Sequence, residues 1–315
     1  MEQYTEAGFA KAIGYFNESI AVDPAFAPGY AGLALTYEGL SSLYMPASEA
    51  MPKAKFAALR ALAIDSTLAE PYSTLAYVKA FYEWKWAEAE PDFRRALELN
   101  PGSAYAYRDY SYFLFTNGRF AESAVALRHA REIDPLSVFL SSMEGTLLYV
   151  SRRYDAAIPV LKTVLKSNPE HATSHMILGL CYLSKREYTA AVAELTEANR
   201  LENSAYNLGR LGCALADSGD RSAALKILDR LNRRSRTEFI QPYCFAVLYV
   251  ALGDVDRAFE WLHRGVIERS EDMCNILNDP DMDRLRSDPR LAGVLQALGF
   301  RPPPDAAGPV AKDGS

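Results

Sequence analysis

The sequence predicts an all-α protein built as a solenoid of repeated helix pairs, and three observations support this fold class. A small residue followed four positions later by a large apolar one recurs along the chain. A proline, or a serine in its place, closes each early unit twelve positions after the small residue, as Pro24 follows Ala12, and these closing positions step by 42, 35, 34 and 34 residues. Between these units, apolar residues three and four positions apart, such as Leu178 and Tyr182 around the small Gly179, predict one face of a second helix.

The recurring signature places one helix in each period. Its small and large positions are Ala12 and Phe16, Ala54 and Ala58, Ala89 and Phe93, Ser123 and Leu127, Ala157 and Leu161, Ala191 and Leu195, Ala224 and Leu228, and Ala258 and Leu262. Asp-Pro or Asn-Pro dipeptides that begin at residues 23, 100, 134 and 168 predict helix ends, because the residue before proline is disfavoured in the α region. Gly118, Gly219 and Gly253 fall between the two helices of their repeats, where we expect a helix-ending residue with positive φ.

Two antiparallel helices in about 34 residues, with this small and large pattern, resemble the tetratricopeptide repeat (TPR). The resemblance implies a right-handed α-solenoid of about seven helix pairs over residues 27–268, preceded by an N-terminal half repeat at 1–26. Full repeats are expected at 27–66, 67–101, 102–135, 136–169, 170–203, 204–236 and 237–268. The first of them holds about eight extra residues, Ser41 to Glu49, which we interpret as a lengthened loop between its helices.

The two ends of the chain predict different behaviour. Residues 269–300 are expected to form capping helices at about 280–287 and 289–298 that cover the apolar face of the last repeat, with Asp279 and Asp288 as their N-caps. Residues 301–315 contain almost no large apolar side chains and are expected to be disordered. The N-terminal helix carries an apolar stripe, and only residues 1–7 precede it as a shield. We expect self-association through this end or a longer natural chain. The stripe is Phe9, Ile13, Phe16 and Ile20.

Two segments have a narrower resemblance. The stretch from Phe81 to Trp86, together with the helix after it, and the stretch from Leu252 to Arg290 are both similar to the C-terminal TPR region of bacterial multidomain regulators. In such proteins the array follows a winged-helix domain, a class III cyclase domain or a Ser/Thr kinase domain. No effector domain of these kinds accompanies the array in this sequence. The resemblance therefore implies a sensing or interaction role.

Composition and charge argue against several classes of protein. A net charge of −6 disfavours direct nucleic-acid binding. The longest apolar run, from Cys244 to Leu252, is far shorter than the roughly 20 residues of a membrane span. The first twenty residues carry several charges and contain no signal-peptide hydrophobic region. We therefore expect a cytoplasmic protein with no membrane partner and no direct nucleic-acid partner.

Candidate chemical groups are few, and we expect neither an enzyme nor a cofactor or metal. His171 and His175 supply only half of a zinc site. The alternation of Asp279, Asp281 and Asp283 resembles a calcium loop, but arginines stand where that loop needs glycine and glutamate, so capping is the preferred interpretation. The four cysteines are spaced by 32, 31 and 30 residues and are expected to be buried thiols, and an arginine cluster near residue 233 is interpreted as a solvated helix end. The cysteines are Cys181, Cys213, Cys244 and Cys274.

The family resemblance also implies a binding surface. TPR ligands usually lie on the concave face that the first helices line, and the corresponding positions here are aromatic and methionine-rich with one charge pair. The set lacks the lysine and asparagine pattern that holds a peptide carboxylate in some TPR domains. The residues are Tyr77, Tyr105, Arg108, Asp109, Tyr112, Phe115, Phe139, Met143, Tyr149, Met176 and Leu180.

Two functions follow as hypotheses. The first is a non-enzymatic scaffold whose concave groove binds an apolar or aromatic peptide or helix of a partner protein. The second is the sensory or regulatory half of a bacterial transcription regulator, cyclase or kinase that is separated from its effector domain.

Overall fold

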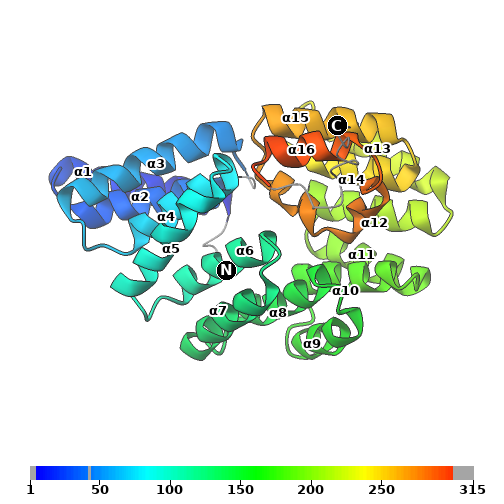
Figure 1. Cartoon of the computed structure of the whole chain (residues 1–315), viewed down its shortest axis with the longest axis horizontal. Helices are drawn as coiled ribbons and strands as arrows, with labels where there is room; N and C mark the ends of the chain where they lie inside the picture. The colour runs from blue at the N-terminus through cyan, green and yellow to red at the C-terminus, as the bar shows by residue number, and fades with distance from the viewer. Residues whose placement is uncertain (1–4, 42–43, 301–315) are drawn as a thin grey trace, which may run out of the picture.

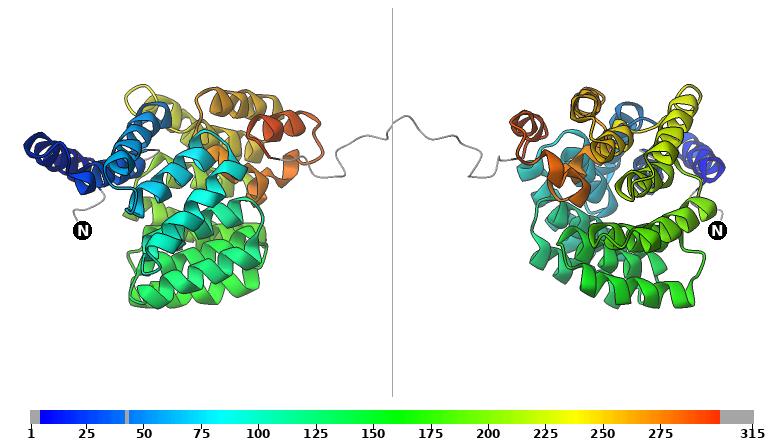
Figure 2. Two further views of the ribbon diagram at one scale, coloured as in Figure 1. Left: turned by 60° about the vertical axis from the view of Figure 1, so that its left-hand side comes forward. Right: turned by 90° about the vertical axis from the view of Figure 1, so that its right-hand side faces the viewer.

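The computed structural model describes residues 5–41 and 44–300, and within these ranges every regular element is a helix (Figure 1). After α1 (Glu6–Val22), helices pair in order, and neighbouring pairs stack side by side, as Figure 2 shows for the cyan and green helices. None of the helices in the described ranges combines the length and apolarity needed to cross a bilayer. The seven pairs are α2 (Ala27–Leu40) with α3 (Ala47–Ile64), α4 (Glu70–Tyr77) with α5 (Trp86–Leu99), α6 (Ala104–Thr116) with α7 (Phe120–Ile133), α8 (Val138–Val150) with α9 (Tyr154–Ser167), α10 (Ala172–Ser184) with α11 (Tyr188–Leu201), α12 (Ala205–Asp217) with α13 (Arg221–Arg234), and α14 (Pro242–Leu252) with α15 (Val255–Ile267).

This arrangement confirms the predicted α-solenoid of seven helix pairs with a half repeat before them. The predicted disordered tail, residues 301–315, lies outside the described residues.

The small residues of the repeated signature lie where the two helices of a pair come closest. Ala157 and Ala191 are completely buried, and so are their large partners Leu161 and Leu195. Glycine on the first helix faces these leucines: a Cβ on Gly179 would lie 2.7 Å from Leu195 Cγ and 3.2 Å from the carbonyl oxygen of Ala191. The small and large spacing therefore encodes the close approach of the helices.

The turns inside the repeats use a left-handed residue. Gly118, Gly219 and Gly253 have φ angles of 74°, 96° and 76°, as predicted. Arg152 and Arg186 take the same conformation, at 63° and 61°, in the turns of their own repeats, although their side chains give no sign of it in the sequence.

The extra residues of the first full repeat are divided between a loop and a helix, which corrects the prediction of a loop alone. Six residues, Ser41 to Pro46, separate α2 from α3. The second helix α3 is 18 residues long, whereas α5 and α7 have 14. The insertion brings Ser41 to the C-terminal part of the chain, where its hydroxyl group donates a hydrogen bond to the Glu271 carboxylate.

The apolar stripe of α1 packs against α2. Phe9 is buried, and glycines on α2 make room for the two phenylalanine rings: a Cβ on Gly32 would lie 2.2 Å from the Phe16 ring, and one on Gly39 would lie 2.8 Å from the Phe9 ring. The side chains that α1 exposes are others, such as Val22 at 87%. Self-association through this end stays a prediction, and the phenylalanines of the stripe face the first repeat.

The C-terminal segment, residues 269–300, does more than cover the last repeat. It forms the 3-10 helices η2 (Glu271–Leu277) and η3 (Pro280–Leu285) and the helix α16 (Arg290–Ala297). Helix α16 packs on α15, as a cap would, whereas η2 contacts α6 and the π-helical turn η1 (Val78–Tyr82). Figure 1 accordingly shows the orange and red C-terminal elements next to the blue and cyan N-terminal repeats. The segment therefore crosses the concave side and closes the solenoid on itself.

Trp86 at the start of α5 holds the far end of this segment. The Phe300 ring stacks on the Trp86 indole with centroids 4.8 Å apart, and the indole Nε1 donates a 2.7 Å hydrogen bond to the Leu298 carbonyl oxygen. The Arg269 guanidinium lies 5.5 Å from the centroid of the Trp84 ring. The stretch from Phe81 to Trp86 and the stretch from Leu252 to Arg290 are the two segments singled out in the sequence. The first thus contacts Arg269 in the second, and it also contacts Leu298 and Phe300, which follow the second.

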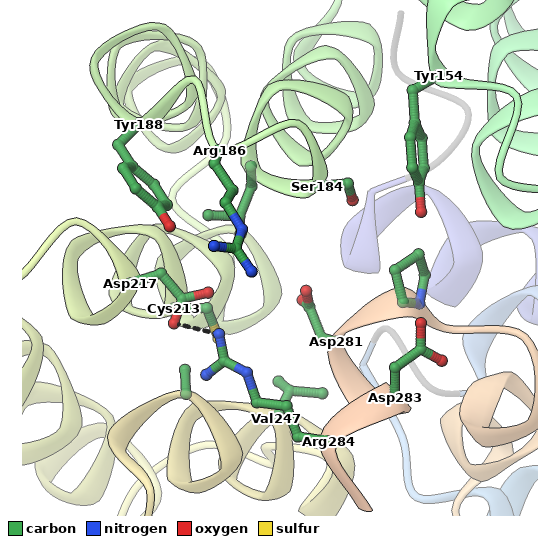
Figure 3. A pocket seen from close by; sticks show the side chains of 13 residues that line it. Tyr154, Ser184, Arg186, Tyr188, Cys213, Asp217, Val247, Asp281, Asp283 and Arg284 are labelled. Atoms are coloured by element: carbon green, nitrogen blue, oxygen red, sulfur yellow. Dashed lines mark hydrogen bonds and ion pairs between the residues drawn. The ribbon is translucent and has the colours of Figure 1, made fainter. Parts of the chain in front are cut away.

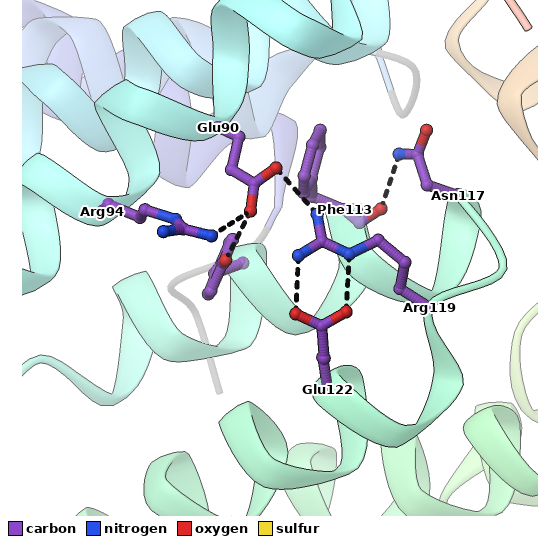
Figure 4. A network of polar contacts seen from close by, with 7 residues as sticks. Glu90, Arg94, Phe113, Asn117, Arg119 and Glu122 are labelled. Carbon is purple, nitrogen blue, oxygen red and sulfur yellow. Dashed lines mark hydrogen bonds and ion pairs between the residues drawn. The ribbon is translucent and has the colours of Figure 1, made fainter.

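An ion-pair network fixes α5 relative to α6 and α7 (Figure 4). Glu90 on α5 accepts hydrogen bonds from Arg119 at 2.7 Å, from Arg94 at 2.8 Å and from the Tyr110 hydroxyl group at 2.9 Å. The hydrogen bond from Arg119, against the opposing effect of burial, lowers the pKa of Glu90 to about 2. The network therefore holds the helix that begins with Trp86.

We predict that Gly179→Ala destabilises the protein by about 1–3 kcal/mol, because the added Cβ meets both a leucine side chain and a backbone carbonyl group. Gly14→Ala is the matched control: no atom lies within 4 Å of its Cβ position, and alanine is favoured over glycine in a helix by about 0.8–1.0 kcal/mol. Urea denaturation measures both. Equal effects of the two substitutions would show that the helices of a pair do not need glycine at their contact.

Candidate functional site: the concave surface

All eleven residues predicted from the repeat register lie on first helices and line two hollows of the concave surface. Five of them line a smaller hollow of about 240 Å³, namely Tyr112, Phe115, Tyr149, Met176 and Leu180. Eight line an apolar groove of about 760 Å³, namely Tyr77, Tyr105, Arg108, Asp109, Tyr112, Phe115, Phe139 and Met143. The 3-10 helix η2 contributes to both hollows: Glu271 and Asp272 line the groove, and Asp272, Cys274 and Asn275 line the smaller hollow.

Several groove residues were not predicted. The repeat register applied to the first full repeat would have identified Gly32, Leu35 and Glu38, all of which line the groove. The walls contributed by α1 and by η2 have no such signal, because those elements lie outside the regular repeats; they supply Phe9, Ala12, Phe16, Glu271 and Asp272.

Aromatic rings form a continuous wall of the groove. Phe81 lies at the centre, with its centroid 4.5 Å from the Tyr77 ring and 4.8 Å from the Tyr112 ring. The Tyr112 and Phe115 rings meet edge to face at 4.9 Å. Phe139, at the opening, is 50% exposed. The groove therefore offers a packed apolar wall and one large side chain that a ligand can cover.

The floor of the groove is polar and buried. The Tyr105 hydroxyl group donates a 2.5 Å hydrogen bond to Glu38 Oε1. Arg108 donates to Asp109 Oδ1 from Nε at 2.8 Å and from Nη2 at 2.6 Å, and its guanidinium lies 3.9 Å from the centroid of the Tyr105 ring. The second oxygens of both carboxylates, Glu38 Oε2 and Asp109 Oδ2, are buried. The hydroxyl groups of Thr74 and Ser73 on α4 lie beside Glu38 and Asp109, respectively, and partly offset the effect of burial on the pKa of each carboxyl group.

Burial determines the charge of this floor. Removal from water, together with the nearby charge of Asp109, raises the pKa of Glu38 to about 8. Burial also raises the pKa of Asp109, in spite of its ion pair with Arg108. At neutral pH the Glu38 carboxyl group is therefore largely protonated.

The smaller hollow contains a buried arginine that anchors the C-terminal segment. Arg210 on α12 is 2% exposed and donates to Asp279 Oδ2 at 2.8 Å and to Asp281 Oδ2 at 2.6 Å. The Tyr243 hydroxyl group also donates to Asp279 Oδ2, at 2.9 Å. Burial raises the pKa of Asp281 to about 6, whereas the Arg210 guanidinium, acting against burial, lowers the pKa of Asp279. The segment is thus fixed by two carboxylates that share one guanidinium.

Asn278 extends this anchor to the end of α6. Its side-chain amide donates to the carbonyl oxygens of Phe115 at 2.9 Å and of Thr116 at 2.8 Å. The last carbonyl groups of a helix have no partner within the helix, so the segment supplies one. On the same helix, the Tyr112 hydroxyl group lies 3.4 Å from Cys274 Sγ.

A third hollow, of about 330 Å³, lies where η3 meets α10 and α12, and its lining is strongly polar (Figure 3). Arg284 pairs with Asp217 at 2.7 Å, and Asp283 at its edge pairs with Arg152 at 2.8 Å. Arg284 and Asp217 are thus paired across the hollow, and Arg186 lines it as well. We interpret this hollow as part of the anchor of η3.

The other candidate groups of the sequence have structural roles. His171 caps α10 by accepting a hydrogen bond from the Ser174 backbone N–H, and His175 pairs with Glu194 at 2.6 Å. Asp279 caps η3 as predicted, while its bond to Arg210 was not foreseen. The arginine cluster near residue 233 pairs with acidic neighbours on its own helix end. The four cysteines are buried free thiols.

We predict that Glu38→Gln removes a pH dependence of stability. Since the pKa of Glu38 is raised to about 8, the unfolded chain releases this proton near pH 4.5 and the folded chain only near pH 8. The stability contributed by the neutral carboxyl group is fully present below about pH 4.5 and is lost as the pH rises through about 8. The variant should be more stable than the wild type at pH 8 and similar at pH 5 in urea denaturation. Parallel pH profiles of the two proteins would contradict the burial of this group.

We also predict that Arg210→Met destabilises the protein by about 3–5 kcal/mol, because it leaves two buried carboxylates without their cation. Arg284→Met is the control, since the Arg284 side chain is 53% exposed and its ion pair should contribute at most about 1 kcal/mol. Hydrogen exchange of residues 271–300 should quicken only in the first variant. Unchanged exchange would show that Arg210 does not hold the segment.

Comparisons with known proteins agree with this architecture. The family model of the tetratricopeptide repeat matches residues 80–137 and 142–205, which include the helices from α5 to α7 and from α9 to α11 and most of α8. No curated protein matches the chain.

Solved structures show the same fold at low sequence identity. The chain is similar to one in the APC/C hetero-tetramer Cut9-Hcn1, at 15% identity and a TM-score of 0.62 over 81% of this chain, and it spans 47% of that chain's length. It is also similar to yeast Tom70, at 16% identity and a TM-score of 0.55 over 92% of this chain and 62% of Tom70. The type IV pilus biogenesis factor PilW gives 18% identity and a TM-score of 0.55 over 73% of this chain and 97% of PilW.

The narrower resemblance to bacterial regulators is not tested by these comparisons and stays a prediction. What they identify is tetratricopeptide repeats in the chain and a fold shared with other helical repeat proteins.

Proposed function

We propose that this chain is a non-catalytic interaction module whose apolar groove binds a peptide or helical segment of a partner protein. The observation that carries the proposal is the groove itself: about 760 Å³ in volume, walled by aromatic rings and open at Phe139. Tetratricopeptide repeats typically serve protein interactions, and the similar Cut9-Hcn1 structure is an assembly of several chains. A large exposed apolar surface rimmed by polar groups is typical of such a site.

The groove residues differ in how well they can test this proposal. Tyr112 packs on Phe81 and Phe115 and approaches Cys274, so its removal would also loosen the C-terminal segment. Phe139 is half exposed and makes only a peripheral contact with Arg108, whose guanidinium lies 5.7 Å from its ring centroid. Phe139→Ala is therefore the cleaner variant.

We expect peptides selected from a phage-displayed library of random 12-residue sequences, with the whole chain as bait, to bind about tenfold more weakly to Phe139→Ala. The reason is that removal of a large aromatic side chain that a ligand covers costs on the order of 1–2 kcal/mol. Phe56→Ala is the matched control, a 66% exposed phenylalanine on α3 that does not line the groove. Fluorescence anisotropy with the synthetic peptides measures both. Selected peptides that bind the two variants equally, or a library that yields no binder, would contradict the proposal.

The second candidate is a regulatory half of a larger signalling protein. One observation favours it: Arg269, in one of the two stretches that resemble bacterial regulators, donates a 3.1 Å hydrogen bond to the Tyr82 carbonyl oxygen in the other and lies 5.5 Å from the centroid of the Trp84 ring, so the two stretches are in direct contact. Co-purification of the chain with a kinase, cyclase or DNA-binding protein encoded beside it would support this role. Independent behaviour of all such neighbours would exclude it.

A further inference from the structure

The apolar groove has an excess of acidic groups. Four carboxyl groups line it, those of Glu38, Asp109, Glu271 and Asp272, and Arg108 is the single cationic side chain among the residues of the described ranges that do so. Ser41 donates a hydrogen bond to Glu271. With every group ionised, this lining carries three more negative than positive charges.

Arg108 pairs with Asp109 and makes no hydrogen bond to Glu38. Both of its hydrogen bonds go to one oxygen, Asp109 Oδ1, and its plane is held near the Tyr105 and Phe139 rings. Glu38 and Asp109 are 6% and 3% exposed, and the hydroxyl groups beside them, those of Tyr105, Thr74 and Ser73, carry no positive charge. A cation brought by a ligand would favour the ionised form of such a buried carboxyl group.

The walls suit a cation on an apolar stem. The Tyr77 and Tyr112 rings line the groove together with the carboxyl groups and are packed on the completely buried Phe81, and aromatic rings attract ammonium and guanidinium groups. Lysine and arginine also carry methylene chains that pack on apolar surface while the charged end reaches a polar partner.

We propose that the groove binds a partner segment in which a lysine or arginine is flanked by apolar residues, with the cation at Glu38 and Asp109 and the apolar side chains against Phe139 and Met143. This inference rests on the proposed function and specifies its ligand. The proposed ligand group is positively charged, whereas the peptide carboxylate that some TPR domains hold is negatively charged.

Binding of such a segment should be linked to proton release. The groups that face Glu38 are Tyr105, Arg108 and Asp109 from α6 and Thr74 and Tyr77 from α4, and Glu271 from η2 faces Tyr77. In the free protein the pKa of Glu38 is about 8, so the group is largely neutral at pH 7. A cation placed beside it favours the ionised form and releases the proton. Affinity should therefore rise from pH 6 to pH 8, a range in which lysine and arginine stay charged.

The test uses the peptides selected on the whole chain at pH 8. We expect them to contain lysine or arginine next to apolar residues, and we expect replacement of that residue by norleucine, which keeps the stem and removes the charge, to weaken binding about tenfold. Glu38→Gln and Asp109→Asn should reduce the preference for lysine over norleucine to about twofold or less. Glu38→Gln should remove the pH dependence above about pH 7, where Asp272, whose pKa burial raises to about 6, is already ionised. Glu18→Gln, an exposed glutamate on α1, is the control that should change neither.

The outcomes separate the two proposals. Peptides that depend on Phe139 but bind equally well with norleucine, or that prefer glutamate and lose affinity as the pH rises, would overturn the basic ligand and leave the groove as a binding site. Peptides that do not depend on Phe139 would overturn the proposed function itself. Selection of sequences matching residues 301–315, which contain Arg301 and Lys312, would assign the groove to the chain's own tail and overturn a separate partner. Thermal unfolding followed by circular dichroism confirms that each variant is folded.

Discussion

The buried Arg210 guanidinium is the constraint on which the shape of this solenoid depends. An arginine cannot lose its charge inside a protein, so its burial requires carboxylates at hydrogen-bond distance. No residue on α12 itself supplies them; Asp279 and Asp281 of the C-terminal segment do. Once η3 is held there, Asn278 reaches the end of α6, and the chain continues through α16 to Trp86. An open stack of helix pairs is thereby closed on itself.

Closure also creates the candidate site. In an open TPR stack the first helices would together form one long concave surface, and the eleven residues predicted from the repeat register would all lie on it. The returning segment covers part of this surface and adds Glu271 and Asp272 to the lining of the groove. The apolar groove therefore combines the regular repeat pattern with an irregular segment that the pattern does not describe. Its acidic and aromatic character arises from both.

The parts of the structure that were predictable are those encoded by local periodicity. The burial of Ala157 with Leu161 and the left-handed turn at Gly118 follow from spacing and from the chemistry of small residues. The same register places Tyr77 and Met143 on the concave surface. The path of residues 269–300 could not be predicted, because Asp279 already has a complete local interpretation as a helix cap. Its bond to Arg210 joins residues 69 apart in the sequence, and no short pattern encodes that distance.

A double-mutant cycle between Trp86 and Phe300 tests the closure of the solenoid most directly. These residues are 214 positions apart in the sequence and touch only if the C-terminal segment reaches the second full repeat. Trp86→Ala, Phe300→Ala and the double variant would be compared by urea denaturation. We expect a coupling energy of about 0.5–1.5 kcal/mol, as for other stacked aromatic pairs. Free energies that add to within about 0.3 kcal/mol would contradict the closed structure.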